Sequence, residues 1–584
     1  MNILGLFGFV QNPAAALVVD GQLIAFAEEE RFTRLKSSNG MFPGNAATYC
    51  LKAGGLTLQD IDVIAWPWDA KRSRTRMPLF FAKQFVKHGL LSRRKYSSKS
   101  KGSNVAEIFQ YLLDVDPGRI RDRVRAGFRR AGHSGAIPKI EFVPHHVAHA
   151  YSTYACSGFD EAAIITIDGS GEDICTQLAV GKNGSVKLLD RIQIPNSLGW
   201  FYAAFTDYLG FIPYRDEGKV MGLAPYGQPD PELAEKFERV LRIDSDGYTI
   251  DPFYTLLGGH EYGANFGDEL VGLFGRPRYR NEPVEARHKN MAYELQRKLE
   301  EAALAMTRKL VRGQNARNLC VAGGVAMNCK MNGVLLRDGG IERIFVQPAS
   351  HDAGTPLGAA LYLAATSGEP RPAPLEHVYY GPGFTNDEIR ATLDVCHVSY
   401  RHVDAIEEEV ARLLADGKIV AWHQGRMEFG SRALGGRSIL ANPTIPDMHD
   451  IVNRQVKFRE PWRPFCPSML DEVKGDYLEN AQQAPFMIVA YQASAARRSQ
   501  IPSVVHVDGS MRPQTVTKHA NPRFHGLIDA FGKLTGVPVV LNTSFNVRGE
   551  PIVCTPNEAV RCFYSTGLDA LAIGNYLVEK DLRK

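Results

Sequence analysis

Short apolar runs separated by polar or glycine-containing turns begin at the first residue of the chain. Residues 2–31 (NILGLFGFVQNPAAALVVDGQLIAFAEEER) contain apolar runs that predict two or three β-strands. The Asp20-Gly21 pair stands between two of these runs and is typical of a tight hairpin turn. The run 61–66 (IDVIAW) predicts a further buried strand.

The same pattern continues with helical segments added. Residues 161–173 (EAAIITIDGSGED) read as an apolar strand that ends in an acidic glycine turn. Residues 317–336 predict a strand, a glycine turn and a helix, and residues 343–365 predict a strand, a polar loop and a helix. Because strands alternate with helices, this part of the chain is predicted to be α/β.

A proline-rich stretch interrupts the pattern at 367–376 (SGEPRPAPLE) and is the best candidate for a linker. Beyond it, apolar runs predict strands between helical segments, at 417–424, 485–491, 503–508 and 536–542. We therefore expect two domains, residues 1–370 and residues 371–584, of which the second is also α/β or α+β.

The composition is that of an ordinary globular protein. Among 584 residues, 44% are hydrophobic and 23% are charged, and no apolar run approaches the length of a membrane span. The nine cysteines form no C-x-x-C pair, and the N-terminus lacks the features of a signal peptide. These features predict a cytoplasmic protein with free thiols and no membrane association.

The net charge of +4 is too small to indicate a nucleic-acid partner. Two stretches are nevertheless rich in Lys and Arg, residues 71–101 and residues 119–130. They are either solvated surface or a rim that attracts phosphorylated substrates.

Three histidines lie close together in FVPHHVAHA (142–150). On a helix, His145 and His149 share one face and could supply two nitrogen ligands to a divalent metal. Asp352, in the ASHDAG stretch after a predicted strand, could supply a third ligand. The alternative is a pair of ordinary polar helix residues. A zinc-protease motif is disfavoured, because His146 occupies the position where that motif has Glu.

Two glycine turns follow predicted strands, at 168–173 (DGSGED) and at 322–328 (AGGVAMN). Glycines there would let backbone N–H groups approach phosphate oxygens, although a simple tight turn would look the same. Two such turns in one α/β domain suggest the duplicated architecture of actin, hexokinase and Hsp70-like ATPases, with nucleotide held between two halves.

Basic and amide side chains recur in four separate segments of the C-terminal part. If these segments converge, the side chains would clamp phosphate oxygens; otherwise they are surface charges. The residues concerned are Arg426, Arg432, Arg437, Lys457, Arg459, Arg463, Arg512, Asn542, Ser544 and Asn546.

Over nearly its whole length the chain resembles the NodU/CmcH family of carbamoyltransferases. The motifs that carry the resemblance are EEERFTRLK, PHHVAHAYS, DGSGE, EGKVMGLAPYG, AGGVAMNCKMNG, HDAGTPLGAA, GRMEFGSRALGGRSIL, VKFREPWRPFCPS, HVDGSMRPQTV and TGVPVVLNTSFNVRGEPIV.

The resemblance implies a threonylcarbamoyl-transferase-like N-terminal domain and a YrdC-like C-terminal domain. It assigns the metal to His145, His149 and Asp352, with His146 outside the ligand set. Its implied catalytic residues are Lys457, Arg459, Arg512, Ser544, Asn546, Arg432 and Arg437. Its implied nucleotide-binding residues are Asp168, Gly169, Gly171, Glu217, Lys219, Gly222, Gly323, Gly324, Asn328, Arg463 and Asn542.

The implied activity is ATP-dependent O-carbamoylation of a small natural product. Carbamoyl phosphate and ATP would give carbamoyl-adenylate in the C-terminal domain, and the N-terminal domain would pass the carbamoyl group to a hydroxyl. The implied cofactors are ATP with Mg²⁺ and a divalent metal, Fe²⁺ first, with Zn²⁺ or Mn²⁺ as alternatives. A homodimer is compatible with this interpretation. N-carbamoylation, a tRNA threonylcarbamoyl modification and an inactive ATPase-like scaffold are the competing interpretations.

The chain departs from the family at one place. Many members carry a His-Asp pair after the first strand, where this chain has Gln11 and Asn12. An amide does not take up a proton at neutral pH, so any deprotonation of the acceptor must be achieved differently.

Overall fold

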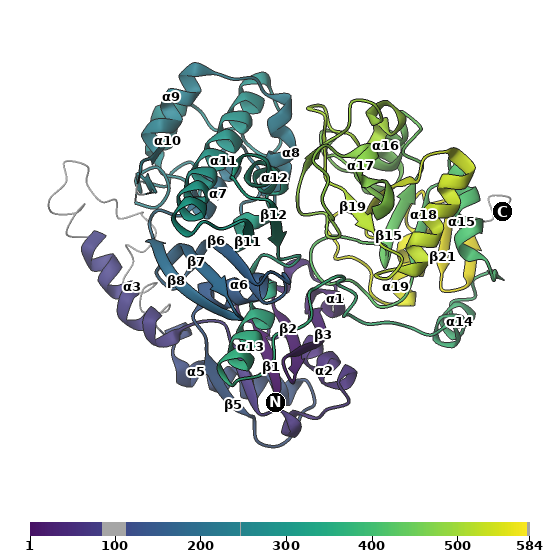
Figure 1. Ribbon diagram of the computed structural model, residues 1–584, viewed down its shortest axis with the longest axis horizontal. Helices are drawn as coiled ribbons and strands as arrows, with labels where there is room; N and C mark the ends of the chain where they lie inside the picture. The colour runs from purple at the N-terminus through teal and green to yellow at the C-terminus, as the bar shows by residue number, and fades with distance from the viewer. Residues whose placement is uncertain (85–112, 246, 258, 581–584) are drawn as a thin grey trace. The chain divides into compact units, whose positions relative to one another are not determined.

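The computed structural model describes residues 1–84, 113–245, 247–257 and 259–580 (Figure 1). Residues 85–101 of the first basic stretch lie outside the described residues. The chain forms two compact units, each assembled from several segments. Unit 1 comprises Met1–Phe7, Leu17–Leu23 and Leu56–Ala373, and unit 2 comprises Gly8–Ala16, Ile24–Gly55 and Pro374–Lys584. The sequence had given no sign that N-terminal stretches would belong to the second unit.

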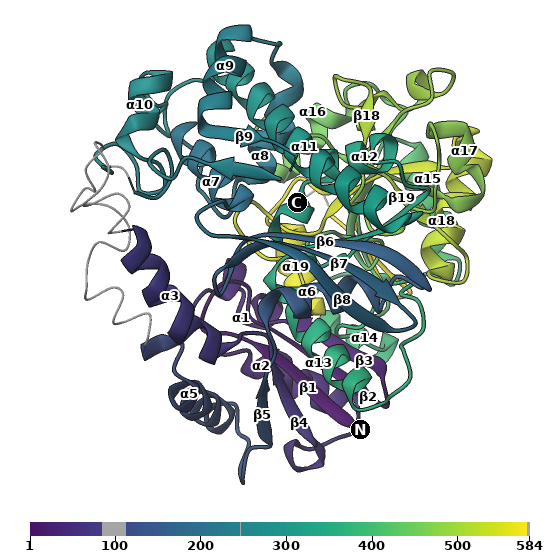
Figure 2. The ribbon, with the colours of Figure 1, turned by 60° about the vertical axis from the view of Figure 1, so that its left-hand side comes forward.

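Two five-stranded sheets share one topology. The first has the order β3-β2-β1-β4-β5 and the second the order β12-β11-β6-β7-β8, so each places its first strand at the centre. In each sheet the first strand pairs in parallel with the fourth, and the fourth with the fifth. Figure 2 shows β6, β7 and β8 side by side. The strands are β1 (Asn2–Phe7), β2 (Ala14–Val19), β3 (Gln22–Glu28), β4 (Val63–Trp66), β5 (Lys139–Phe142), β6 (Glu161–Gly171), β7 (Ile174–Lys182), β8 (Ser185–Gln193), β11 (Asn318–Ala322) and β12 (Arg343–Val346).

The predicted N-terminal hairpin is confirmed. Asp20 and Gly21 join β2 to β3 with φ angles of 48° and 78°, the left-handed conformation that a two-residue hairpin turn requires. The repeated sheet order confirms the duplicated α/β architecture expected for the first part of the chain.

Helices of unit 1 pack closely around these sheets. A Cβ built on Gly358 of α13 would lie 1.8 Å from the carbonyl oxygen of Ala148 in α6, so only glycine allows this approach. The elements of unit 1 are α3 (Ala70–Gln84), α5 (Pro117–Arg130), α6 (His145–Tyr154), α7 (Leu198–Tyr208), α8 (Glu217–Leu223), α9 (Pro231–Val240), α10 (Asp268–Phe274), α11 (Ala286–Gln314), α12 (Cys329–Asp338) and α13 (Thr355–Thr366), the short helices η2 (Leu58–Asp60), η4 (Ala224–Tyr226), η5 (Gly324–Met327) and η6 (Asp352–Gly354), and the paired strands β9 (Leu241–Ile243) and β10 (Tyr248–Ile250).

Unit 2 is built on a mixed eight-stranded sheet with the order β13-β22-β21-β14-β15-β20-β16-β19. Helices α15 and α18 pack together and form its apolar core with Trp422 and the central strands. The strands are β13 (Arg401–His402), β14 (Val420–His423), β15 (Arg437–Ala441), β16 (Cys466–Leu470), β19 (Gln514–Val516), β20 (Val539–Ser544), β21 (Ala570–Ile573) and β22 (Tyr576–Glu579), with a separate pair β17 (Tyr491–Gln492) and β18 (Ser510–Met511).

The helices of unit 2 include three elements from the N-terminal part of the chain. These are α1 (Glu30–Thr33), η1 (Lys36–Ser38) and α2 (Gly44–Ala53). The others are α14 (Asn386–Val395), α15 (Ile406–Ala415), α16 (Met448–Val452), η7 (Asn453–Lys457, a π-helical turn), η8 (Asp471–Val473), α17 (Lys474–Tyr477), η9 (Arg498–Gln500), η10 (Pro502–Val504), α18 (Pro522–Thr535) and α19 (Pro556–Tyr564).

Two strand predictions in this unit are wrong. Residues 485–490 form an apolar but irregular segment, in which Met487 has a φ of 53° that interrupts any extended run, and only the last predicted residue, Tyr491, lies in a strand, the two-residue β17. Residues 503–508 begin with a short helix at Pro502–Val504 and continue as a turn. The first segment buries its apolar side chains without regular pairing, and burial of that kind produces the same sequence pattern as a strand. In the second segment Val504 is buried but Val507 is exposed.

The predicted fold class, α/β with a duplicated N-terminal part, is confirmed. No helix within the described ranges is long and apolar enough to cross a membrane.

Candidate metal centre and anion site

The helix α6 presents His145 and His149 on one face, as their spacing predicted. Both side chains are fully buried, and their Nε2 atoms lie 3.1 Å apart. The Nδ1 atom of His145 lies 3.1 Å from the carbonyl oxygen of Pro67, which accepts a hydrogen bond when Nδ1 carries the proton. In that tautomer the Nε2 lone pair of His145 faces His149.

Two carboxylates complete the cluster. Asp168 Oδ2 lies 3.1 Å from His145 Nε2 and 3.2 Å from His149 Nε2. Asp352 Oδ1 lies 3.6 Å and 3.9 Å from the same two nitrogens. One donor atom from each of the four residues falls within 4.8 Å of every other. The structure thus brings together the three predicted ligands and adds Asp168, for which the sequence had suggested a phosphate-binding role.

The donor set fits a divalent cation. Two imidazole nitrogens and two carboxylate oxygens converge, and each of the four atoms can offer a lone pair to a cation when it carries no proton. Burial lowers the pKa of His145, but the neighbouring Asp168 and Asp352 carboxylates outweigh it and raise that pKa well above its ordinary value. Burial lowers the pKa of His149. A bound cation satisfies these four acceptors together, and this mixed set suits Fe²⁺, Zn²⁺ and Mn²⁺ alike.

His146 takes no part in the cluster. Its Nδ1 lies 2.7 Å from Thr166 Oγ1 and its Nε2 lies 3.1 Å from the carbonyl oxygen of Ile174. Burial lowers its pKa to about 3, so the ring is neutral. The residue therefore ties α6 to β6 and β7.

Glu172 and Gly171 support the cluster from the turn after β6. Glu172 Oε1 accepts hydrogen bonds from the backbone N–H of His145 and of Asp69, and so holds the first turn of α6. A Cβ on Gly171 would lie 2.5 Å from the His145 ring, so this glycine makes room for the imidazole. A metal-supporting position for Gly171 was not foreseen, since the sequence suggested only nucleotide binding.

The second glycine turn packs against the first. Gly323 has a φ of 96° and leaves no room for a Cβ beside the backbone of Ile167. The N–H groups of Gly324 and Gly169 both donate to Asp168 Oδ1, over 3.0 Å and 2.8 Å. These bonds fix the Asp168 carboxylate, so that its other oxygen faces the two histidines.

The remaining predicted nucleotide residues of unit 1 lie in α8 and α12. The Asn328 side chain caps α12 and exchanges hydrogen bonds with Gln296. Lys219 Nζ donates to Asp216 over 2.9 Å, and Gly222 is buried in α8. Burial raises the pKa of Glu217 to about 7. These residues form polar surroundings, but their role toward a nucleotide remains a proposal.

In unit 2, Lys457 reaches the end of β20. Its Nζ lies 2.8 Å and 3.0 Å from the carbonyl oxygens of Ser544 and Asn546, and 2.7 Å from Asn546 Oδ1. Only 6% of Lys457 is exposed. Burial lowers the pKa of its ammonium group well below the ordinary value, and the positive charge of Arg459 lowers it further. Lys457, Ser544 and Asn546, three of the predicted catalytic residues, therefore lie together.

The charges of Arg459 and Arg463 act on Lys457, and the charge of Arg512 acts on Arg459. Burial, and then the charge of Arg463, lowers the pKa of Arg459 to about 9, and Arg512 contributes in the same direction. Arg512 donates from Nε and Nη2 to Cys466 Sγ, over 3.3 Å and 3.1 Å. Buried Lys457 and these three half-buried arginines concentrate positive charge in a way that suits a phosphate or another anion.

Three other predicted residues of unit 2, Arg437, Asn542 and Arg432, differ in how deeply they are buried and in what they contact. Arg437 is fully buried and directs Nε, Nη1 and Nη2 to main-chain carbonyls, among them Gln424 and Cys554, so its environment indicates a structural role. Asn542 is also buried and donates to Ser468 Oγ over 2.9 Å within the sheet. Arg432 is half-buried in the loop between β14 and β15.

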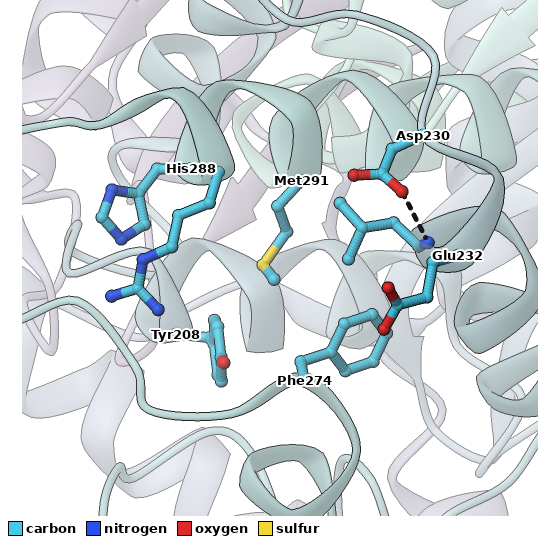
Figure 3. Close-up of a pocket in the computed structure, with 8 residues that line it drawn as sticks. Tyr208, Asp230, Glu232, Phe274, His288 and Met291 are labelled. Carbon is cyan, nitrogen blue, oxygen red and sulfur yellow. Dashed lines mark hydrogen bonds between the residues drawn. The ribbon is translucent and has the colours of Figure 1, made fainter.

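A separate pocket of about 110 Å³ opens among α7, α9, α10 and α11 in unit 1 (Figure 3). Its centre is apolar, with Tyr208, Phe274 and Met291 facing one another, and the Asp230 carboxylate at one end caps α9. The pocket shares no residue with the metal cluster. Its lining residues are Tyr208, Asp230, Glu232, Leu233, Phe274, Arg287, His288 and Met291.

Two family models match most of the chain. The family model "Carbamoyltransferase N-terminus" matches residues 2–361, and "Carbamoyltransferase C-terminus" matches residues 411–580. Nodulation protein NolNO of Sinorhizobium fredii is 38% identical, over 98% of this chain and 79% of that protein. Nodulation protein U of Rhizobium tropici is 31% identical, over 96% of this chain and 93% of that protein.

Solved structures resemble only part of the chain. A ROK hexokinase from Thermus thermophilus is 16% identical and covers 63% of this chain and 100% of its own, with a TM-score of 0.29. Full-length HypF in its phosphate- and nucleotide-bound form is 12% identical and covers 62% of this chain and 46% of its own, with a TM-score of 0.31. With two family models matching most of its length, the chain belongs to the carbamoyltransferase family and is a transferase.

Proposed function

We propose that the protein is an ATP-dependent O-carbamoyltransferase that works in two steps. In the first, carbamoyl phosphate, ATP and water give carbamoyl-adenylate, pyrophosphate and inorganic phosphate. In the second, an acceptor hydroxyl attacks the carbamoyl carbon, AMP leaves, and one proton is released. The observation that carries the proposal is the meeting of Lys457 with Ser544 and Asn546 in a buried, strongly basic site.

We assign the first step to unit 2. Lys457, Arg459 and Arg512 would bind the phosphate oxygens of carbamoyl phosphate and ATP, with Ser544 and Asn546 orienting the Lys457 ammonium. Because Lys457 is buried and the two arginines are half-buried, their attraction for an anion is stronger than it would be at a fully exposed surface. The arriving negative charge also offsets the unfavourable burial of the ammonium group.

We assign the second step to unit 1. His145, His149, Asp168 and Asp352 would hold the divalent metal, for which Fe²⁺ is our first choice. When bound, the metal supplies Lewis-acid stabilisation of negative charge on a phosphate or carbonyl oxygen. Glu172 and the two glycine N–H groups on Asp168 keep the ligand side chains in place. The nucleotide would lie near the glycine turns of β6 and β11.

A second candidate is N-carbamoylation of an amine, favoured by one feature. Gln11 and Asn12 occupy the place of the His-Asp pair that many family members carry. A neutral amine attacks through its own lone pair and loses its proton afterwards, so it needs no base before the attack. A hydroxyl acceptor would instead need a base from another part of the chain or from the substrate.

The proposal is tested by incubating the protein with carbamoyl phosphate, ATP and Mg²⁺, and measuring pyrophosphate and AMP. We expect pyrophosphate to require both substrates, and AMP release to require the metal and an acceptor from a panel of alcohols and amines. The Lys457→Ala variant should lose adenylate formation. The His149→Ala variant should keep adenylate formation and lose transfer.

Equal loss of both steps in the two variants would contradict the two-site mechanism. Absence of any carbamoyl-phosphate-dependent pyrophosphate from the wild-type protein would contradict the proposed function itself. The acceptor panel separates the candidates, because product formation with amines alone selects N-carbamoylation.

A further inference from the structure

The short helix α1 brings two arginines from the N-terminal part of the chain into unit 2. Arg31 lies within α1, and Arg34 ends it in the left-handed conformation, with a φ of 61°. Arg31 is 3% exposed, and the Arg34 side chain is 17% exposed. Buried arginines of this kind need partners, and both find them on loops more than 390 positions away in the sequence.

Arg31 contacts the loop that joins β14 to β15. Its Nη2 donates to the carbonyl oxygen of Gly430 over 2.8 Å, while Glu28 accepts from its Nε over 3.0 Å. Burial opposes the charge of Arg31, but the carboxylates of Glu28, Glu30 and Glu428 more than compensate and raise its pKa. Glu428 in turn accepts from the backbone N–H of Leu434 over 2.7 Å. This loop carries Arg432.

Arg34 contacts the loop that follows β20. Its Nη1 and Nη2 donate to the carbonyl oxygens of Ile552 and Pro551, over 2.7 Å and 2.8 Å. Its Nη1 also lies 3.3 Å from Glu558 Oε2, which accepts from the N–H groups of Cys554 and Thr555 at the start of α19. One guanidinium thus fixes two adjacent carbonyls and the cap of the next helix.

The Arg34 contacts are connected to the anion site by a short path. Asn546, which accepts from Lys457 Nζ, donates from Nδ2 to the carbonyl oxygen of Glu550 over 2.7 Å. The next two residues, Pro551 and Ile552, are the ones that Arg34 holds. The turn from Ser544 to Cys554 is therefore held on one side by Lys457 and on the other by Arg34.

We propose that α1 is a positioning element of the anion site, in which Arg34 sets the Ser544–Cys554 turn and Arg31 sets the loop that bears Arg432. The proposal rests on the assignment of adenylate formation to this site. Arg34 does not contact the substrate; it acts by holding Asn546 and Ser544 where they orient the Lys457 ammonium. The N-terminal part of the chain is then needed for the chemistry of the C-terminal part.

A guanidinium is required by this geometry. It presents parallel N–H donors to two neighbouring carbonyls, whereas a lysine ammonium at the same place would satisfy only one of them in good geometry. Loss of the second bond would let the turn shift. A displacement on the order of 1 Å in a positioning group lowers rates by about 100-fold.

The test compares Arg34→Lys and Arg34→Gly with the wild-type full-length protein. The activity measurement is carbamoyl-phosphate-dependent exchange of pyrophosphate into ATP. We expect kcat to fall by about 10- to 100-fold in both variants, with a smaller change in the KM for carbamoyl phosphate. Added guanidinium ion should restore part of the activity of Arg34→Gly and none of that of Arg34→Lys.

The matched control is Arg371→Gly. Arg371 also donates to main-chain carbonyls, those of Ala155 and Phe159 in unit 1, and touches neither loop of the anion site. Its loss should leave the exchange reaction within about twofold of wild type. Equal losses in the Arg34 and Arg371 variants, or no response of Arg34→Gly to guanidinium, would reduce Arg34 to a stabilising residue and overturn the proposal.

Hydrogen exchange gives a measurement that needs no activity. In Arg34→Gly, the amides of residues 545–554 should exchange faster, while those of α18 keep wild-type rates. Unchanged exchange in 545–554 would overturn the proposal even if the activity fell. If the wild-type protein shows no pyrophosphate exchange at all, the proposed function fails, and the hydrogen-exchange result alone still decides whether α1 holds the turn.

Discussion

At the scale of single residues, Lys457 has the most unusual environment among the groups assigned to adenylate formation. Its Nζ is surrounded by carbonyl, hydroxyl and amide oxygens of Ser544 and Asn546. Burial and the neighbouring Arg459 charge both favour the neutral amine, and so its pKa is lowered. An anion bound beside it favours the charged form and reverses that effect. Anion binding and protonation of Lys457 are therefore coupled.

This coupling predicts a pH dependence with a definite sign. Because the pKa of Lys457 is lowered, the group loses its proton at a lower pH than an ordinary lysine, and the Kd for carbamoyl phosphate should then rise. The Kd can be measured by calorimetric titration at several pH values from about 6 to about 10. We expect the rise in Kd to begin at a pH below the ordinary lysine pKa of about 10.4. In Lys457→Arg the rise should move to higher pH, since a guanidinium holds its proton more strongly than an ammonium group in the same surroundings. Identical pH profiles for the two proteins would contradict the coupling.

At the scale of elements, the metal cluster depends on the packing of α6 against α13. Helix α6 carries His145 and His149, and η6, which bears Asp352, leads directly into α13. The two helices touch where Gly358 meets the carbonyl oxygen of Ala148. Close approach at this point keeps ligands from two segments of the chain within reach of one cation.

The Gly358→Ala variant tests that packing. A methyl group has no room beside Ala148, so the helices must separate, and we expect a loss of about 1–3 kcal/mol in the free energy of unfolding. Metal affinity should fall together with it, as measured by titration with Zn²⁺ or Mn²⁺. Gly313→Ala in α11 is the control, because open space surrounds Gly313 and alanine favours the helix. Wild-type metal affinity in Gly358→Ala would show that the ligands do not depend on this contact.

At the scale of the whole molecule, the two candidate sites lie in different compact units. The candidate metal ligands belong to unit 1, while Lys457 and its partners belong to unit 2. Unit 2 also takes in α1, η1 and α2 from the N-terminal part. The proposed division of chemistry between the units thus does not follow a single cut in the sequence.

Hydrogen exchange on the full-length chain checks this division. Adding the divalent metal should slow exchange in α6 and η6 and leave residues 453–466 unchanged. Adding carbamoyl phosphate should slow exchange around residues 457 and 544–554 and leave α6 unchanged. In each case the ligand stabilises the segments that bind it against local opening. Protection of α6 by carbamoyl phosphate alone would contradict the assignment of its binding to unit 2.

Much of the fold could be predicted because the signals were local. The hairpin at Asp20-Gly21, the helix carrying His145 and His149, and the strand–turn–helix at 317–336 each follow from neighbouring residues. The strand predicted at 485–491 failed because a buried irregular segment is as apolar as a buried strand. The strand predicted at 503–508 failed because its valines do not share one environment, since Val504 is buried and Val507 is exposed.

The sequence by itself determined the family, the α/β architecture and three of the metal-binding candidates. Motif spacing and hydrophobic periodicity depend only on residues that are close together in the sequence. Only the tertiary structure decided that Asp168 joins the metal cluster, that the arginine at 437 is committed to carbonyl groups, and that α1 belongs with the anion site. Each of these depends on contacts between segments far apart in the chain. Such contacts depend on the packing of the whole fold, and they cannot be predicted from the residues around one position in the sequence.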